Sequence, residues 1–306
     1  MSHRRALALM ILITLLWSVA GVVSRHLEYA GSFEVTFWRS IFNAVTLSIA
    51  LTLIRGAGLW RTLLRAPWPV WFSGFCWSVM FTAFMVAITL TTVANVLVTM
   101  AIGPLITALF ARIFLRHSLP LRTWLAIAVA SLGIAWMFGQ EASSGLSLTG
   151  TLVALAVPLA AALNFTMLQH AGHGQVVPAR PVRHDMLPAV LIGAVLSALY
   201  TLPLALPFQA STHDLALLAM LGSVQLALPC LLLVRVSREL TAPEIALLGL
   251  LEVVFGVSWA WLGAGETPTA STLTGGALVL GALFANEALA LLDRRRKLPR
   301  RQGHAR

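Results

Sequence analysis

The sequence predicts an all-α membrane protein with ten transmembrane helices, and three observations support this prediction. Of the 306 residues, 58% are hydrophobic and only 10% are charged, whereas a soluble domain must cover its surface with more polar side chains. About ten apolar stretches alternate with short polar connections, and each approaches the roughly 20 residues that a helix needs to cross a bilayer. The second half of the chain also repeats the apolar pattern of the first, so that residue 241 corresponds to residue 92, 149 positions earlier.

The expected spans follow one another closely and leave no room for a separate soluble domain. In chain order they cover residues 6–24, 34–54, 69–90, 93–115, 121–139, 149–168, 186–207, 214–235, 242–263 and 271–291. Four prolines fall inside these spans: Pro104, Pro158, Pro203 and Pro229. Because proline removes a backbone donor, each one could form a hinge or a static kink that a neighbouring helix satisfies.

The spans group into two five-helix repeats, residues 1–140 and 141–293, followed by a basic tail at residues 294–306. Five is an odd number of crossings, so the second repeat must enter the bilayer from the side opposite to the first. Inverted repeats of this kind are typical of alternating-access transporters, which bind their substrate between the repeats near the middle of the membrane.

The net charge is +10, and the basic residues are distributed unevenly between the two sides of the membrane. If the N-terminus lies inside, the inner connections and chain ends carry all 21 Lys and Arg residues except Arg25 and Arg39. The positive-inside rule predicts this bias and places both termini in the cytoplasm, with the chain in the inner (plasma) membrane. We expect the tail to bind the anionic surface of the lipid bilayer, and we expect no nucleic-acid partner.

Glu252 is the clearest candidate for a functional side chain. It lies about ten residues from either end of the ninth expected span, or roughly 15 Å from each membrane surface at about 1.5 Å per residue. A carboxyl group at this depth must face the interior of the bundle or a water-filled cavity. It could bind a cationic group of the substrate, carry a coupled proton, or remain neutral and hydrogen-bonded to a neighbouring helix.

Arg39 and Asn43 are candidates for a polar stripe in the second span. Arg39 could extend to the nearby membrane surface, or it could line the cavity and bind a carboxylate or phosphate group through its planar guanidinium. Asn43 follows one helical turn later on the same face.

Four further residues complete the predicted substrate-binding set. Asn164 and Gln225 lie within spans, where their amides need internal hydrogen-bond partners, so we expect both to face inward. Trp17 and Trp77 could stack on a planar substrate or could simply fill space in the bundle.

The sequence contains none of the familiar signatures of membrane-associated enzymes. It has no phosphate-binding Gly-rich loop followed by Lys and Ser or Thr, no His-Glu-x-x-His motif and no Gly-x-Ser-x-Gly motif. We therefore expect no enzymatic activity, no catalytic residues, no cofactor and no metal site.

Short stretches in both halves of the chain match the pattern of one membrane-protein family. They are Leu15-Leu16-Trp17-Ser18, Phe37-Trp38-Arg39, Gly103-Pro104-Leu105, Leu250-Leu251-Glu252, Gly265-Glu266-Thr267-Pro268 and Gly275-Gly276-Ala277-Leu278. With these stretches the chain resembles, over nearly its whole length, the EamA-type carriers of the drug/metabolite transporter superfamily. Two positions depart from the family pattern, because Val253 stands where a proline is usual and Arg116-His117 replaces the Gly-Glu of the first repeat.

The resemblance implies a ten-helix inner-membrane carrier that exports amino acids, related metabolites or toxic compounds. A nucleotide-sugar or lipid-linked carrier of the same superfamily is an alternative, although a phosphorylated substrate would favour more cationic cavity residues than Arg39 alone. A non-transporting membrane scaffold is a second alternative, favoured by the two departures. Gly275, Gly276 and Gly281 permit close helix packing, either within the bundle or between the protomers of a homodimer.

Overall fold

The computed structural model of the chain is helical wherever it has regular secondary structure among the residues it describes. Those residues are 3–56, 58–115, 120–144, 148–172, 186–237, 239–240, 245, 248–249 and 251–297. Six helical stretches in them, two of which join consecutive helices, are long and apolar enough to cross a membrane, and four shorter apolar helices accompany them. The predicted class, an all-α multi-pass membrane protein, is therefore confirmed.

The helices of the first half are α1 (His3–Ser24), α2 (Ser32–Arg55), α3 (Gly58–Leu64), α4 (Trp68–Leu90), α5 (Val93–Met100), α6 (Gly103–Leu115) and α7 (Leu121–Ser144). Those of the second half are α8 (Leu148–Gly172), α9 (Leu187–Ala205), α10 (Thr212–Met220), η1 (Leu221–Ala227), α11 (Leu228–Val236), α13 (Leu251–Ala264) and α14 (Ala270–Lys297).

Three of these elements differ from single uninterrupted spans. The fourth expected span, 93–115, is broken into α5 and α6 immediately before Gly103 and Pro104. The eighth, 214–235, contains the π-helical turn η1 between α10 and α11. Of the ninth, 242–263, residues 242–244, 246–247 and 250 lie outside the described part of the chain, so α13 is the part of this span whose course is known.

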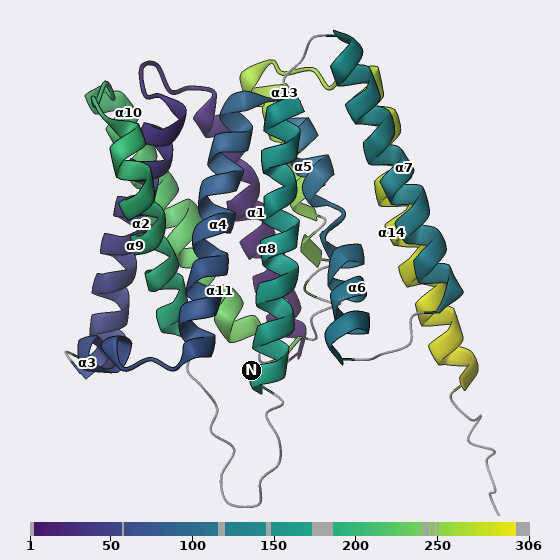
Figure 1. Cartoon of the computed structure of the whole chain (residues 1–306), viewed down its shortest axis with the longest axis horizontal. Helices are drawn as coiled ribbons and strands as arrows, with labels where there is room; N and C mark the ends of the chain where they lie inside the picture. Colours follow the sequence, from purple (N-terminus) through teal and green to yellow (C-terminus); the bar gives the residue numbers. More distant parts are fainter. Residues whose placement is uncertain are drawn as a thin grey trace, which may run out of the picture.

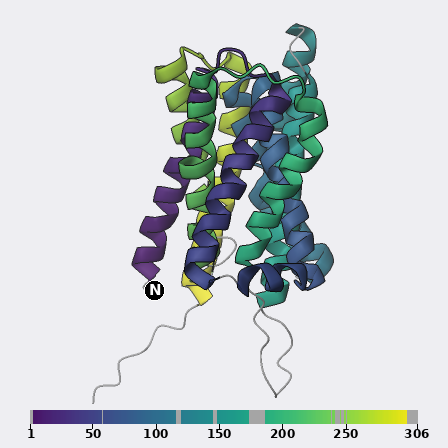
Figure 2. The same cartoon turned by 90° about the vertical axis from the view of Figure 1, so that its left-hand side faces the viewer.

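The long helices run roughly side by side and form one bundle (Figures 1 and 2). We call the end where α1 begins the near end, which is the lower end in Figure 1, and the end where α1 finishes the far end. The short helix α3 lies at the near end, whereas α10 and the last turn of α13 lie at the far end. The pair α7 and α14 packs together along one side of the bundle.

Close helix contacts depend on small residues where two backbones approach. A Cβ atom on Gly193 of α9 would lie 3.0 Å from the carbonyl oxygen of Gly74 on α4, and one on Gly74 would lie 2.5 Å from a methyl carbon of Ile192. Neither position can therefore accept a side chain without moving the helices apart. Small residues at such contacts are how membrane helices gain dispersion contacts in a solvent as apolar as their own side chains.

Two carboxylates organise the loops at the far end by accepting backbone N–H bonds. Glu34 accepts from the amides of Gln209 and Ala210 at 2.9–3.0 Å. Asp214 forms a capping box with Ser211 at the start of α10. It also accepts from the amides of Glu28 and Tyr29 at 2.8 and 3.1 Å, and thereby holds the connection between α1 and α2 against α10.

Candidate functional site

The structure contains a cavity of about 130 Å³ inside the bundle. It is enclosed by α1, α4, the α5–α6 break, α8, α11 and the region of α13. The lining residues are Met10, Trp17, Met80, Leu97, Met100, Ala101, Gly103, Pro104, Thr107, Val157, Pro158, Ala161, Leu233, Ile245, Gly249, Glu252 and Val253. Most of the wall is apolar, as is usual for sites that bind organic ligands.

Glu252 is the ionisable residue among those that line the cavity. It lies in the first turn of α13 and is half-buried. No described residue forms a hydrogen bond or a salt bridge with its carboxyl group. An acidic group so placed, with free acceptor oxygens in an apolar chamber, can receive a cationic or hydrogen-bond-donating group of a ligand.

Arg39 and Gln225 lie behind the wall of the cavity and are linked to it. Nη2 of Arg39 donates to Oε1 of Gln225 at 2.9 Å, and Nε2 of Gln225 donates to the backbone carbonyl of Trp17 at 3.0 Å. The indole of Trp17 lines the cavity, so this chain of contacts joins α2, η1 and the cavity wall. The Arg39 guanidinium also lies 5.8 Å from the centre of the Phe84 ring.

The charge of Arg39 is buried without a contacting counter-ion. The side chain is 3% exposed, and no carboxylate of the described residues lies within salt-bridge distance of it. Glu252 is near enough for an electrostatic interaction with the guanidinium. The structure therefore brings one basic and one acidic side chain within electrostatic range of each other at the cavity.

Asn43 lies one turn after Arg39 and is fully buried. Among the described residues, neither Oδ1 nor Nδ2 of its amide has a hydrogen-bond partner, and Nε of Arg39 also lacks one. Buried amides are almost always satisfied in folded proteins, so this part of the seam between α2 and η1 is unusual.

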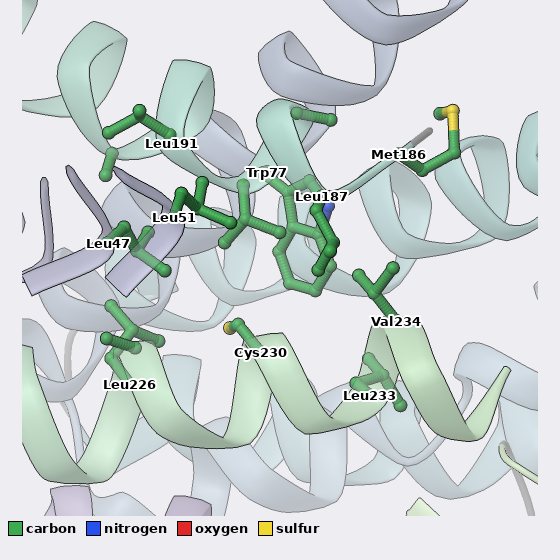
Figure 3. Packing of buried hydrophobic residues seen from close by; sticks show 14 of the residues in the cluster. Leu47, Leu51, Trp77, Met186, Leu187, Leu191, Leu226, Cys230, Leu233 and Val234 are labelled. Atoms are coloured by element: carbon green, nitrogen blue, oxygen red, sulfur yellow. The ribbon is translucent and has the colours of Figure 1, made fainter. Parts of the chain in front are cut away.

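The other two predicted residues lie away from the cavity lining. Trp77 belongs to a hydrophobic cluster with Leu47, Leu51 and Cys230 (Figure 3). Its ring lies 5.4 Å from that of Phe81, with the two ring planes tilted by 34°. Asn164 on α8 is buried against α4, where its Oδ1 accepts a 2.6 Å hydrogen bond from Ser73. The structure thus brings Glu252, Trp17, Gln225, Arg39 and Asn43 together and separates Trp77 and Asn164 from the cavity wall.

Several cavity residues carry no chemical signal in the sequence. Met10, Met80 and Met100 come from three different helices and are ordinary apolar residues of their spans. Pro104 and Pro158 could have been recognised, because prolines inside spans are frequent where a helix borders a cavity. Both line the cavity, whereas Pro203 and Pro229 do not belong to its lining.

Comparisons with known proteins agree with this architecture. Residues 4–139 match the EamA-like transporter family. The chain is 25% identical over 256 residues to the pseudopaline exporter CntI of Pseudomonas aeruginosa, in strains UCBPP-PA14 and PAO1 alike, which covers 82% of this chain and 84% of the exporter.

A solved crystal structure also shares the fold, with a TM-score of 0.63 and 20% sequence identity over 94% of this chain and 99% of the other. The family consists of transporters and not of enzymes. The chain is therefore similar to the EamA-like transporter family in residues 4–139, and to an exporter of metabolites over 82% of its length.

Proposed function

We propose that the protein is a secondary transporter that exports a small metabolite, such as an amino acid, a derivative or a toxic compound, across the inner membrane. The observation that carries the proposal is Glu252, an ionisable group with free acceptor oxygens in the apolar wall of an internal cavity. The likeness to a pseudopaline exporter over most of the chain favours export over import.

The mechanism that we propose is alternating access between two inverted five-helix repeats, residues 1–140 and 141–293. Support comes from helix packing that matches when the two halves are exchanged. The contact of α1 with α13 corresponds to that of α8 with α6, and the contact of α4 with α9 corresponds to that of η1 with α2. A cavity enclosed by helices of both halves fits a substrate that binds between the repeats.

Within this site, we assign one ligand-binding role to the acidic side chain and one to the basic side chain. Glu252 binds a cationic or donor group of the substrate, or a coupled proton in its place. Arg39, supported by Asn43, attracts an anionic group, because a buried guanidinium without a contacting carboxylate is stabilised by any negative charge that approaches it. Gln225 positions Arg39, and Trp17 forms part of the cavity wall.

The substitution Glu252→Gln tests the proposal. The glutamine keeps the shape and hydrogen-bonding capacity of the side chain but cannot ionise. We expect export to be lost or uncoupled while the protein remains folded, measured as extracellular metabolites from cells that overproduce the wild type or the variant at equal membrane levels. Wild-type efflux by a well-folded Glu252→Gln protein would remove Glu252 from the mechanism.

The matched control is Glu28→Gln at the far end, which removes a carboxylate that is exposed and outside the cavity. We expect this variant to export like the wild type. If no compound in a broad amino-acid and metabolite panel accumulates outside wild-type cells, the export proposal fails for those compounds and the scaffold alternative gains weight.

A further inference from the structure

We propose that Arg25 and Glu266 form a gate at the far end of the bundle, and that the cavity opens to this side only after their contacts separate. The gate lies outside the substrate-binding residues and joins segments that are distant in the sequence. It rests on the proposed alternating access, but its test measures access to the cavity and not export.

The contacts of Arg25 tie the end of α1 to two other segments. Nε of Arg25 donates to Oε2 of Glu266 at 3.2 Å. Nη1 donates to the carbonyl oxygen of Ile88 at 2.9 Å, and Nη2 donates to that of Thr91 at 2.8 Å. One guanidinium therefore binds the end of α4 and the segment that follows α13.

Glu266 adds a fourth segment through its other oxygen. Oε1 accepts from the backbone amide of Val93, the first residue of α5, at 2.9 Å. The position of Glu266 is fixed by its own backbone, because Gly265 has φ +66° and the Glu266 amide donates to Ala260 at 3.1 Å. A glycine in the left-handed region is a common way to end a helix, and this backbone bond to the carbonyl oxygen of Ala260, six residues earlier, holds Glu266 against the last turns of α13.

The four segments joined by the gate belong to helices that also form the wall of the cavity. Trp17 of α1, Met80 of α4, Leu97 of α5 and Glu252 of α13 all line it. Arg25 and Ile88 follow Trp17 and Met80 by eight residues each, which corresponds to about 12 Å along a helix. On α1 and α4 the gate therefore lies about two turns beyond the cavity.

The remainder of the cavity extends away from the gate. Met10 near the start of α1 and Leu233 near the end of α11 line it towards the near end. A substrate that enters from the near end is thus separated from the far end by the gate, and transport to the far side requires Arg25 and Glu266 to part. Charge-assisted hydrogen bonds to several backbone groups make such a closure both strong and reversible.

The test measures access to the cavity from each side with a membrane-impermeant maleimide. Met100→Cys places a thiol on the cavity wall, and the chain without it gives the background, since Cys76 and Cys230 are buried. Sealed right-side-out and inside-out vesicles present one end each. In the wild-type background we expect rapid labelling from the near end and slow labelling from the far end.

Adding Arg25→Gln or Glu266→Gln should raise the rate of labelling from the far end by about tenfold or more, the scale of a lost charge-assisted contact. Glu28→Gln, which removes an exposed charge from the same end, should leave the rate unchanged. An unchanged far-end rate in both gate variants overturns the proposal, even if Glu252→Gln still abolishes export.

A further variant tests the gate independently, in case the Arg25 and Glu266 variants do not fold. Val93→Pro removes the N–H that Glu266 accepts and keeps both gate side chains, and proline is well tolerated at the first position of a helix. Because the Val93 side chain is itself buried, Val93→Ala, which keeps the N–H, is the matched control and should leave the far-end rate unchanged. Thr92 before it already has the extended conformation that proline requires, with φ −73° and ψ 149°. We expect an intermediate rise in far-end labelling, and no rise in a folded Val93→Pro protein also contradicts the gate.

Discussion

At the scale of single residues, the buried polar atoms near the cavity are the feature that packing alone does not explain. Both amide atoms of Asn43 and Nε of Arg39 are buried without a partner among the described residues, although an unsatisfied buried polar group costs about 1–3 kcal/mol. By contrast, the hydroxyl group of Thr46, three residues after Asn43, donates a hydrogen bond to the hydroxyl group of Ser223 at 2.8 Å. Within α2 the unsatisfied atoms of the described residues therefore belong to Arg39 and Asn43, while Trp17 Nε1, Thr99 Oγ1 and Asn164 Nδ2 are unsatisfied in other helices.

The substitution Asn43→Leu separates a binding role from a structural one. Leucine has nearly the shape of asparagine and removes both unsatisfied atoms, so we expect the free energy of unfolding to rise by about 1–3 kcal/mol while export falls. Thermal unfolding in detergent and efflux from cells measure the two effects. Thr46→Val, which breaks a satisfied hydrogen bond in the same seam, should instead lower stability by about 1 kcal/mol. A destabilised Asn43→Leu protein would contradict this assignment.

At the scale of elements, the sequence predicts the existence of spans better than their interruptions. The break between α5 and α6 was foreshadowed by Gly103 and Pro104, because proline cannot continue the hydrogen bonds of the preceding turn. The π-helical turn η1 had no such sign. It lies at a tight tertiary contact, since a Cβ atom on Gly222 would lie 2.6 Å from the carbonyl oxygen of Arg39 in a different helix.

The same limit applies to the residues of the site. Glu252 was identifiable because a carboxylate deep in an apolar span needs an inward position. Trp77 and Asn164 were predicted on equally general grounds, as an aromatic and an amide side chain within a span. Both instead lie in contacts between α4 and its neighbouring helices, away from the cavity. Arg25 and Glu266 are 241 positions apart, and local sequence patterns contain no information about such a pairing.

The capping box at the start of α10 gives a prediction at this scale. Asp214→Ala removes the acceptor for the Ser211 amide and for the two amides of the α1–α2 connection. We expect a loss of about 1–2 kcal/mol in stability, the range measured for helix caps, seen as a lower unfolding temperature. Asp214→Asn keeps one acceptor oxygen and should lose less. Equal unfolding temperatures for Asp214→Ala and the wild type would show that the cap contributes nothing.

At the scale of the whole molecule, the near and far ends differ in charge. Arg55, Arg61 and Arg65 lie around α3 at the near end, whereas the far end holds Arg25 together with the carboxylates Glu34, Asp214 and Glu266. By the positive-inside rule, we propose that the near end faces the cytoplasm.

This orientation predicts that tags fused to the two termini are digested by protease in inside-out vesicles and protected in right-side-out vesicles. An even number of spans requires both tags to behave alike. Opposite behaviour of the two tags would rule out ten spans, and protection of both in inside-out vesicles would reverse the orientation of the cavity and the gate.

The three methionines of the cavity wall have a consequence for the breadth of selectivity. Met10, Met80 and Met100 lie on separate helices around one chamber, and thioether side chains are unbranched and polarisable, so they can repack around apolar groups of different outline. A wall of this kind discriminates weakly by shape, whereas a charge without a neutralising partner discriminates strongly by sign. We therefore propose that the cavity accepts substrates of different shape that share one arrangement of charge. Leucine or phenylalanine in place of these methionines should narrow the range of substrates without changing the charge that is selected.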